Sequence, residues 1–198
     1  LKGEIIPQGA KNEALQILCA TLLTDQAVRV DNLPDILDIR HLIELIEGLG
    51  VKITRHDAHS FTFEAKEVNI DFFGTEEFQK NARKIRGSVM LLAPLLARYK
   101  QAILPKPGGD KIGRRRLDTH FLGLQKLGAE FDYNESKAQY EIKAHALKGT
   151  YILMDEISVT GTANVLMAAV LSEGKTTIYN AACEPYIQQL CRMLINMG

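Results

Sequence analysis

An internal repeat is the feature that most constrains the fold of this chain, because similar segments recur roughly every 75 residues. Each segment begins with a long apolar stretch of helical spacing, followed by a turn, an alternating stretch typical of a strand, and a second turn. The three occurrences are residues 14–34, 87–105 and 163–182. Three copies in a row predict one domain with approximate threefold internal symmetry.

A second amphipathic helix that ends in glycine follows each of these segments. The three helices are predicted at residues 42–50, 121–128 and 190–198. Their last residues, which we expect in the left-handed conformation that ends a helix, are Gly50, Gly128 and Gly198. Alternating strand pairs with polar turns follow the first two helices, at 51–63 and 130–142. The repeated unit is therefore helix, strand, helix, hairpin, and the fold class is α/β.

Composition and charge exclude several classes of protein. The 24 basic and 24 acidic residues cancel, so the long-range field that gathers nucleic acid or anionic membrane is missing and we expect neither partner. Cys19, Cys183 and Cys191 are scattered, which favours free thiols in a reducing compartment. No apolar run approaches the roughly 18 residues of a membrane span, so we expect a cytoplasmic protein. No G-x-G-x-x-G follows a predicted strand and the histidines do not cluster, so we expect no cofactor and no metal.

The first candidate anion site is residues 9–12, between a predicted short strand at 4–6 and the first apolar helix. Backbone N–H groups at the start of that helix, with Lys11 beside them, would form a small phosphate cradle. The alternative is that Gly9 is a turn residue and Lys11 a solvated charge. The residues alone leave both interpretations open.

A second group of cations is Lys80, Arg83, Lys84 and Arg86, which we predict to share one helix. Spacings of three and four residues would place them in pairs on common faces. Such charged stretches are usually solvated surface. Arg86 differs because apolar residues follow it at once, which predicts a guanidinium at the edge of a cleft.

The strongest signal is the glycine-rich, basic stretch at residues 107–120. Its glycines predict a loop, and its arginines lead into a helix, a combination suited to closing over a polyanionic substrate. Asp110 within it is a candidate proton donor, because a bound phosphate would favour its protonated form. The alternative is an ordinary basic surface loop.

Residues 155–162 precede the third apolar helix and contain several capping residues. They are sufficient for an ordinary N-cap, which needs no ligand. Free N–H groups and hydroxyls at a helix start could equally seat a diphosphate.

These motifs resemble the UDP-N-acetylglucosamine 1-carboxyvinyltransferase family along essentially the whole chain. The resemblance is carried by residues 9–15, 107–113, Arg115, Asp118, His120, residues 123–129 and residues 180–185. It implies transfer of the enolpyruvyl group of phosphoenolpyruvate to the 3-hydroxyl of UDP-N-acetylglucosamine, with release of phosphate, in the first committed step of peptidoglycan synthesis.

The resemblance also implies an architecture, since the family has two similar inside-out α/β barrel domains of three repeats each, with the substrates between them. We therefore expect residues 1–10 to cross to a second domain and residues 11–198 to form one threefold-repeat domain. The chain has no initial methionine and stops after a helical pattern. We interpret it as an N-terminal half whose partner is the second domain of the same protein, and expect it to be inactive alone.

Site residues follow from the resemblance residue by residue. Lys11 and Arg115 would hold the phosphoenolpyruvate phosphate, Asn12 the sugar and Arg86 the anions of the cleft, while Asp110 would supply the proton. The implied nucleotide contacts are Arg115, Arg116, Leu117, Asp118 and Thr119, and the implied diphosphate contacts are Ser158, Val159 and Thr160.

Three positions depart from the family pattern. Most members have a cysteine where this chain has Asp110, and that cysteine is alkylated by fosfomycin, so we expect intrinsic fosfomycin resistance. Arg116 stands where proline is usual, and Thr160 with Gly161 replaces a Gly-Ala type pair. The nucleotide contacts at both places therefore stay open.

Two rival functions remain. The related transferase that acts on shikimate 3-phosphate shares fold and chemistry, although the motifs at residues 9–12 and 107–109 favour the sugar nucleotide. A non-catalytic nucleotide-sugar-binding protein would explain Asp110. Lys11, Arg86 and Arg115 argue against it, because a protein without a phosphate to bind has little use for three separately placed cations.

Overall fold

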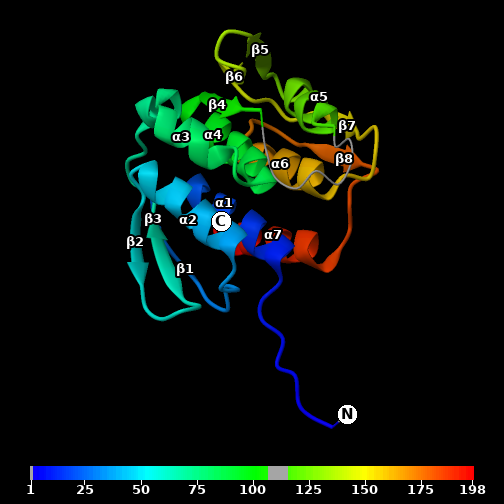
Figure 1. Ribbon diagram of the computed structural model, residues 1–198. Helices are drawn as coiled ribbons and strands as arrows, with labels where there is room; N and C mark the ends of the chain where they lie inside the picture. The colour runs from blue at the N-terminus through cyan, green and yellow to red at the C-terminus, as the bar shows by residue number, and fades with distance from the viewer. Residues whose placement is uncertain (1, 107–115) are drawn as a thin grey trace.

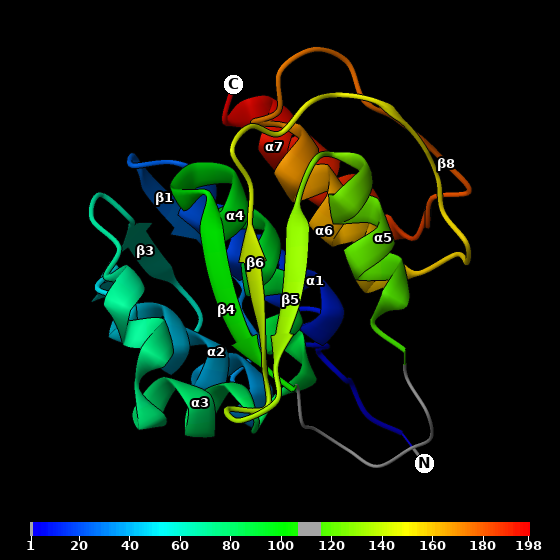
Figure 2. The ribbon, with the colours of Figure 1, turned by 90° about the horizontal axis from the view of Figure 1, so that it is seen from above.

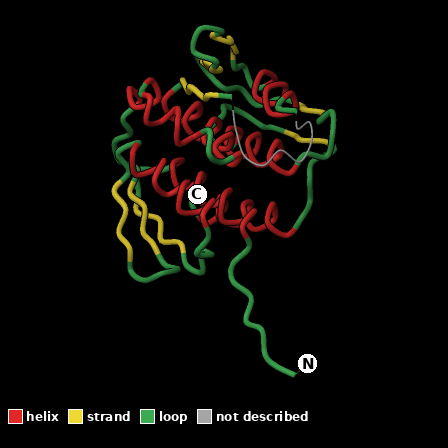
Figure 3. The backbone as a smooth tube through the Cα atoms, in the orientation of Figure 1, coloured by secondary structure: helices red, strands yellow, loops and turns green. Residues whose placement is uncertain are grey.

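The computed structural model describes residues 2–106 and 116–198. Helices form the centre of the molecule, and three small sheets lie at its periphery (Figures 1 and 3). Asp110 and Arg115 lie outside the described residues. None of the described helices is long and apolar enough to cross a membrane.

The first unit has the expected order of helix, strand, helix and hairpin. Its elements are α1 (Lys11–Ala20), the 3-10 turn η1 (Thr21–Leu23), β1 (Ala27–Val30), α2 (Leu37–Gly48), β2 (Lys52–Arg55) and β3 (Phe61–Glu64). The three strands form an antiparallel sheet in the order β1-β3-β2, in which the buried Phe63 lies opposite both Val28 and Ile53.

The second unit repeats this order after two connecting elements. The connection is η2 (Ile70–Gly74) and α3 (Glu76–Ala82), and the unit is η3 (Arg86–Leu91), α4 (Leu92–Tyr99), β4 (Gln101–Pro105), α5 (Asp118–Lys126), β5 (Glu130–Asn134) and β6 (Gln139–Lys143). Figure 2 shows its strands side by side in the order β4-β6-β5.

The third unit differs because a strand precedes its first helix. It consists of β7 (Tyr151–Leu153), α6 (Val159–Ala169), β8 (Thr177–Tyr179) and α7 (Pro185–Asn196). β7 pairs with β8 in parallel, with Ile152 opposite Ile178. In this unit the strand before the helix and the strand after it are therefore neighbours.

The core lies between the first helices of the three units. α1 buries every residue from Ala14 to Ala20, and α6 buries Gly161 through Val165 together with Met167 and Ala168. Helices that are buried on all sides belong at the centre of a domain, whereas α2 and α7 bury only one face and lie outside them. The arrangement is inside-out, and the three sheets do not close into a barrel.

Several local predictions are confirmed. Gly50, Gly128 and Gly198 have φ angles of 87°, 104° and 97°, the left-handed conformation expected where their helices end. All three cysteines are free.

Two predictions about secondary structure are wrong. Residues 4–6 form no strand, and Ile5 and Ile6 are 92% and 82% exposed. The cations from Lys80 to Arg86 do not share a helix, because α3 ends at Ala82. The Oγ of Ser88 lies 2.8 Å from the carbonyl oxygen of Ala82, where the next helical N–H would bind.

Candidate active site

A cavity of about 760 Å³ lies between the starts of α1, η3 and α6 and the residue that leads into α5. It brings together residues from all three units. The sequence-predicted site residues that line it are Lys11, Asn12, Arg86, Arg116, Ser158, Val159 and Thr160. Leu117, Asp118 and Thr119 are not among its lining residues, and their nucleotide contacts stay a prediction.

The start of α6 presents hydrogen-bond donors to this cavity. The Ser158 hydroxyl oxygen accepts from the N–H of Gly161 at 3.1 Å, which confirms Ser158 as the N-cap. The backbone N–H groups of Val159 and Thr160 have no acceptor among the hydrogen bonds of the described residues. A capped helix start with free N–H groups is electropositive and suits an anion.

The start of α1 forms a second wall of the cavity. The residue before the helix, Ala10, provides no side-chain cap, so the first N–H groups are left for another acceptor. A Cβ on Gly9 would overlap the backbone oxygen of Asn32, so the chain can enter the helix along this path only with glycine. Gly9 of the predicted phosphate cradle is therefore required for steric reasons.

Lys11 donates from Nζ to Asp38 at 3.1 Å, with both side chains about half exposed. An ion pair with this exposure contributes about 0–1 kcal/mol. The ammonium can therefore exchange Asp38 for an anionic ligand at little cost, and Asp38 holds it at the cavity meanwhile.

The arginines connect two walls of the site. Arg86 donates from Nη2 to the backbone oxygen of Arg116 at 3.3 Å. Arg116 in turn donates from Nε to Asp118 at 2.6 Å, and this carboxylate raises the pKa of the Arg116 guanidinium. Thr119 is buried and donates to Glu156 at 3.3 Å. In this structure the side chain of Asp118 therefore binds Arg116, and that of Thr119 binds Glu156.

A buried histidine lies behind the start of α6. His120 Nε2 is 3.1 Å from the hydroxyl oxygen of Thr160, and Nδ1 is 2.7 Å from the amide nitrogen of Asn164. Burial, and to a lesser extent the positive charge of Arg86, lowers the pKa of His120 to about 4, so the ring is neutral at pH 7.

Sequence reasoning missed other residues of the cavity wall. They include Gln16, Asp38 and Tyr186. Lys84 and Glu156 also line the cavity, and they were predicted only as members of the second group of cations and of residues 155–162. The signal for Gln16 was available, because it is the amide inside the apolar stretch of the first helix. Its side chain is buried, and neither amide atom has a hydrogen-bond partner among the residues that the structure describes. The described residues include no group of three or more His, Cys, Asp or Glu side chains that could hold a metal ion.

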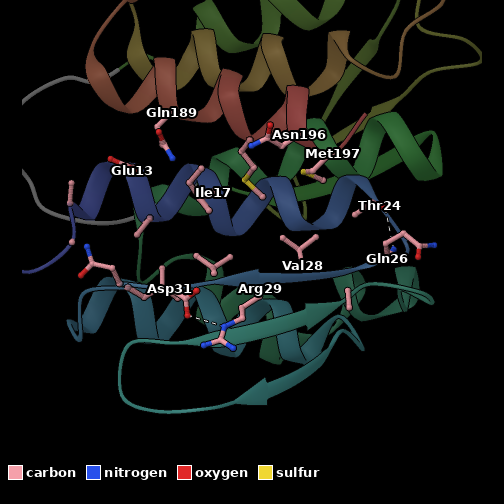
Figure 4. A pocket seen from close by; sticks show the side chains of 18 residues that line it. Glu13, Ile17, Thr24, Gln26, Val28, Arg29, Asp31, Gln189, Asn196 and Met197 are labelled. Carbon is pink, nitrogen blue, oxygen red and sulfur yellow. Dashed lines mark hydrogen bonds and ion pairs between the residues drawn. The ribbon is translucent and has the colours of Figure 1, made fainter.

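A second hollow of about 680 Å³ lies between α1, β1 and the end of α7 (Figure 4). Of the sequence-predicted sites, it is lined only by Gly9 and Ala10, the first two residues of the candidate anion site at 9–12. Its walls include Ile17, Val28 and Met197, and its one arginine, Arg29, donates to Asp31 at 3.0 Å. In the described part of the chain β1 pairs only with β3, so its other edge faces this hollow.

The fold and the first cavity together define a class: an inside-out α/β domain that gathers helix starts, a lysine and arginines around a cavity suited to an anionic small molecule. The family model of EPSP synthase (3-phosphoshikimate 1-carboxyvinyltransferase) matches residues 1–198, and the chain belongs to this family of enolpyruvyl transferases.

Curated relatives show which members of the family this chain is similar to in sequence. The chain is 61% identical over 198 residues to the UDP-N-acetylglucosamine 1-carboxyvinyltransferase of Porphyromonas gingivalis and 60% identical to that of Bacteroides fragilis. In each case the match covers 100% of this chain and 46% of the relative. The chain therefore spans about half the length of the curated relatives it matches.

Solved structures support the fold. The enolpyruvyl transferase NikO from Streptomyces tendae aligns with a TM-score of 0.79 at 20% identity, covering 100% of this chain and 45% of that one. EPSP synthase from Acinetobacter baumannii aligns with a TM-score of 0.67 at 17% identity, covering 96% and 43%. The enolpyruvyl transferase fold expected from the sequence is confirmed.

Proposed function

We propose that this chain is the N-terminal half of a UDP-N-acetylglucosamine 1-carboxyvinyltransferase. It would act in the cytoplasm in the first committed step of peptidoglycan synthesis, on which cell shape and division depend. The observation that carries the proposal is the convergence of Lys11, Arg86 and the start of α6 on one cavity. The chain is about 60% identical over its whole length to relatives named UDP-N-acetylglucosamine 1-carboxyvinyltransferase, which favours the sugar nucleotide over shikimate 3-phosphate as the acceptor.

In this proposal each wall of the cavity holds one part of the substrates. Lys11, released from Asp38, and Arg115 take the phosphate of phosphoenolpyruvate, and Asn12 takes the sugar. Arg86 adds positive charge near both anions. The diphosphate lies at the start of α6, where the hydroxyls of Ser158 and Thr160 and two backbone N–H groups are available.

The reaction adds the sugar 3-hydroxyl to C2 of phosphoenolpyruvate while C3 gains a proton, and phosphate then leaves. Fixed cations stabilise the charge that develops on the phosphate. We assign the proton donor to Asp110, an acid placed in the loop that would close over the substrates. No cofactor and no metal is required by these steps.

The second domain completes the site in this proposal. Residues 1–10 would cross to it, and residues 11–198 would form the first domain. The extended course of residues 2–8 away from the body of the molecule is consistent with such a crossing (Figure 1). The 198-residue chain alone is expected to be inactive.

The test is phosphate release from phosphoenolpyruvate by the chain joined to the second half that its relatives carry. We expect release with UDP-N-acetylglucosamine and none with shikimate 3-phosphate. Lys11→Ala should abolish release, whereas Lys126→Ala, at an exposed position on α5, should not change it. Release only with shikimate 3-phosphate would show that the protein is the related transferase that acts on that acceptor. Release with neither acceptor would favour a non-catalytic nucleotide-sugar-binding protein.

We also propose intrinsic fosfomycin resistance, because a carboxylate at position 110 lacks the soft sulfur nucleophile. The full-length enzyme should keep its activity after incubation with fosfomycin, and Asp110→Cys should become sensitive. Mass spectrometry of the treated wild-type protein checks the same point. A covalent adduct on Asp110 would contradict the proposal.

A further inference from the structure

The neutral His120 has a proton on only one of its ring nitrogens, and its surroundings determine which one. Asn164 Nδ2 lies 2.7 Å from His120 Nδ1 and 3.0 Å from the backbone oxygen of Val89. A carbonyl oxygen can only accept, so the Asn164 atom between these two groups is the amide nitrogen. That nitrogen donates one hydrogen to each neighbour.

The donor from Asn164 makes Nδ1 of His120 an acceptor. The ring proton is therefore on Nε2, which lies 3.1 Å from the hydroxyl oxygen of Thr160. The opposite tautomer would place two donors against each other at Nδ1, and an imidazolium would do the same. His120 is 2% exposed, so bulk water does not reach either ring nitrogen.

The consequence falls on Thr160, whose hydroxyl oxygen accepts from His120. Its own hydrogen must point elsewhere, and none of the described residues accepts it. Thr160 lines the cavity. Ser158 behaves similarly, because its oxygen accepts from the N–H of Gly161.

We propose that Asn164 and His120 are positioning residues that hold the Thr160 hydroxyl as a hydrogen-bond donor toward the ligand, so that this end of the cavity selects an acceptor-only group such as a diphosphate. The inference rests on the proposed function for the identity of the ligand. The chain of donors, Asn164 to His120 to Thr160, depends only on the geometry of the described residues.

Binding to the full-length enzyme tests the donor. We measure the dissociation constants of UDP-N-acetylglucosamine and of inorganic pyrophosphate by calorimetry. Thr160→Val keeps the shape and removes the hydroxyl, and should weaken both ligands about tenfold, while Thr160→Ser should restore binding. Equal affinity of Thr160→Val and wild type would overturn the proposal.

A second variant tests the positioning role. Asn164→Asp replaces the donor at Nδ1 by an acceptor, which moves the ring proton to Nδ1 and makes Thr160 donate to His120. It should weaken pyrophosphate binding about as much as Thr160→Val does, and the double variant should be no weaker than either. Additive losses would show that Asn164 acts only on the stability of the site.

The tautomer is also measurable without any ligand. The ring nitrogens of ¹⁵N-labelled His120 should show the Nε2–H tautomer in the wild-type enzyme and the Nδ1–H tautomer in Asn164→Asp. A wild-type ring protonated on Nδ1 would overturn the inference. If UDP-N-acetylglucosamine fails to bind while pyrophosphate and the tautomer behave as expected, the proposed substrate fails and the positioning role stands.

Discussion

Single residues of this domain respond to pH according to their burial. His120 is enclosed between two helices, and its neutral form is the one that fits there, whereas His145 is exposed. In the unfolded chain a histidine gains a proton near its ordinary pKa of 6.5, but in the folded chain His120 resists protonation down to about 4. The unfolded state therefore binds more protons than the folded state between these values.

The free energy of unfolding should consequently be highest above pH 6.5 and fall by about 3 kcal/mol as the pH approaches 4. Denaturant titrations at a series of pH values measure this slope. His120→Gln should flatten it, because glutamine does not titrate in this range. A wild-type slope that survives in His120→Gln would show that another group titrates.

Ser158 should contribute to both stability and binding. Ser158→Ala removes the cap of α6 and should lower the free energy of unfolding by about 1 kcal/mol. Thr75 is a matched control, since it caps α3 in the same way, at 3.2 Å from the N–H of Phe78, and does not line the cavity. Thermal unfolding should show that Ser158→Ala and Thr75→Ala lower the free energy of unfolding by similar amounts. Calorimetry with UDP-N-acetylglucosamine should separate them, with weaker binding for Ser158→Ala alone.

The site residues that sequence could predict are those with local signals. Ser158 stands before an apolar helix and Lys11 follows a glycine, so the types of residue and their order are sufficient. His120 and Asn164 are 44 positions apart, and neither has a local feature that indicates the other. Their contact depends on how α5 packs against α6, which no single motif specifies.

At the scale of elements, the packing of α5 against α6 depends on a glycine, which has no side chain. Gly123 lies inside α5, where a Cβ would collide with Cγ2 of Val165 on α6. Gly123→Ala should lower the free energy of unfolding by about 1–3 kcal/mol, although alanine is the better helix former. Val165→Ala removes the colliding group, so the double variant should be less destabilised than the sum of the single variants. Denaturant titration of the four proteins measures this coupling, and strict additivity would contradict the close approach.

The order of helices, strands and hairpins could be predicted because each of these elements carries its own periodicity and the second helix of each unit ends at a glycine. The two errors concern elements that depend on a distant partner. Residues 4–6 have the composition of a strand but find no neighbouring strand in the described part of the chain. The helix at Lys80 ends at Ala82, whose carbonyl oxygen accepts from the hydroxyl of Ser88, a residue six positions further along the chain.

At the scale of the whole molecule, residues 2–8 contribute little to the stability of this domain. They are exposed and form no secondary structure. Deleting residues 1–8 should leave the thermal unfolding midpoint of the 198-residue chain unchanged within about 1 °C, because exposed terminal segments have few contacts to lose. The same deletion in the full-length enzyme should abolish phosphate release if the segment crosses to the second domain. A large decrease in the thermal unfolding midpoint of the 198-residue chain would show that the segment packs on this domain.

The open edge of β1 has a consequence for synthesis in the cell. In a chain of the relatives' length, synthesis of the remainder after these 198 residues takes roughly tens of seconds. During this interval the edge and the apolar wall beside it can pair with a strand from another nascent chain. We therefore expect slow codons downstream of these residues to lower the soluble yield.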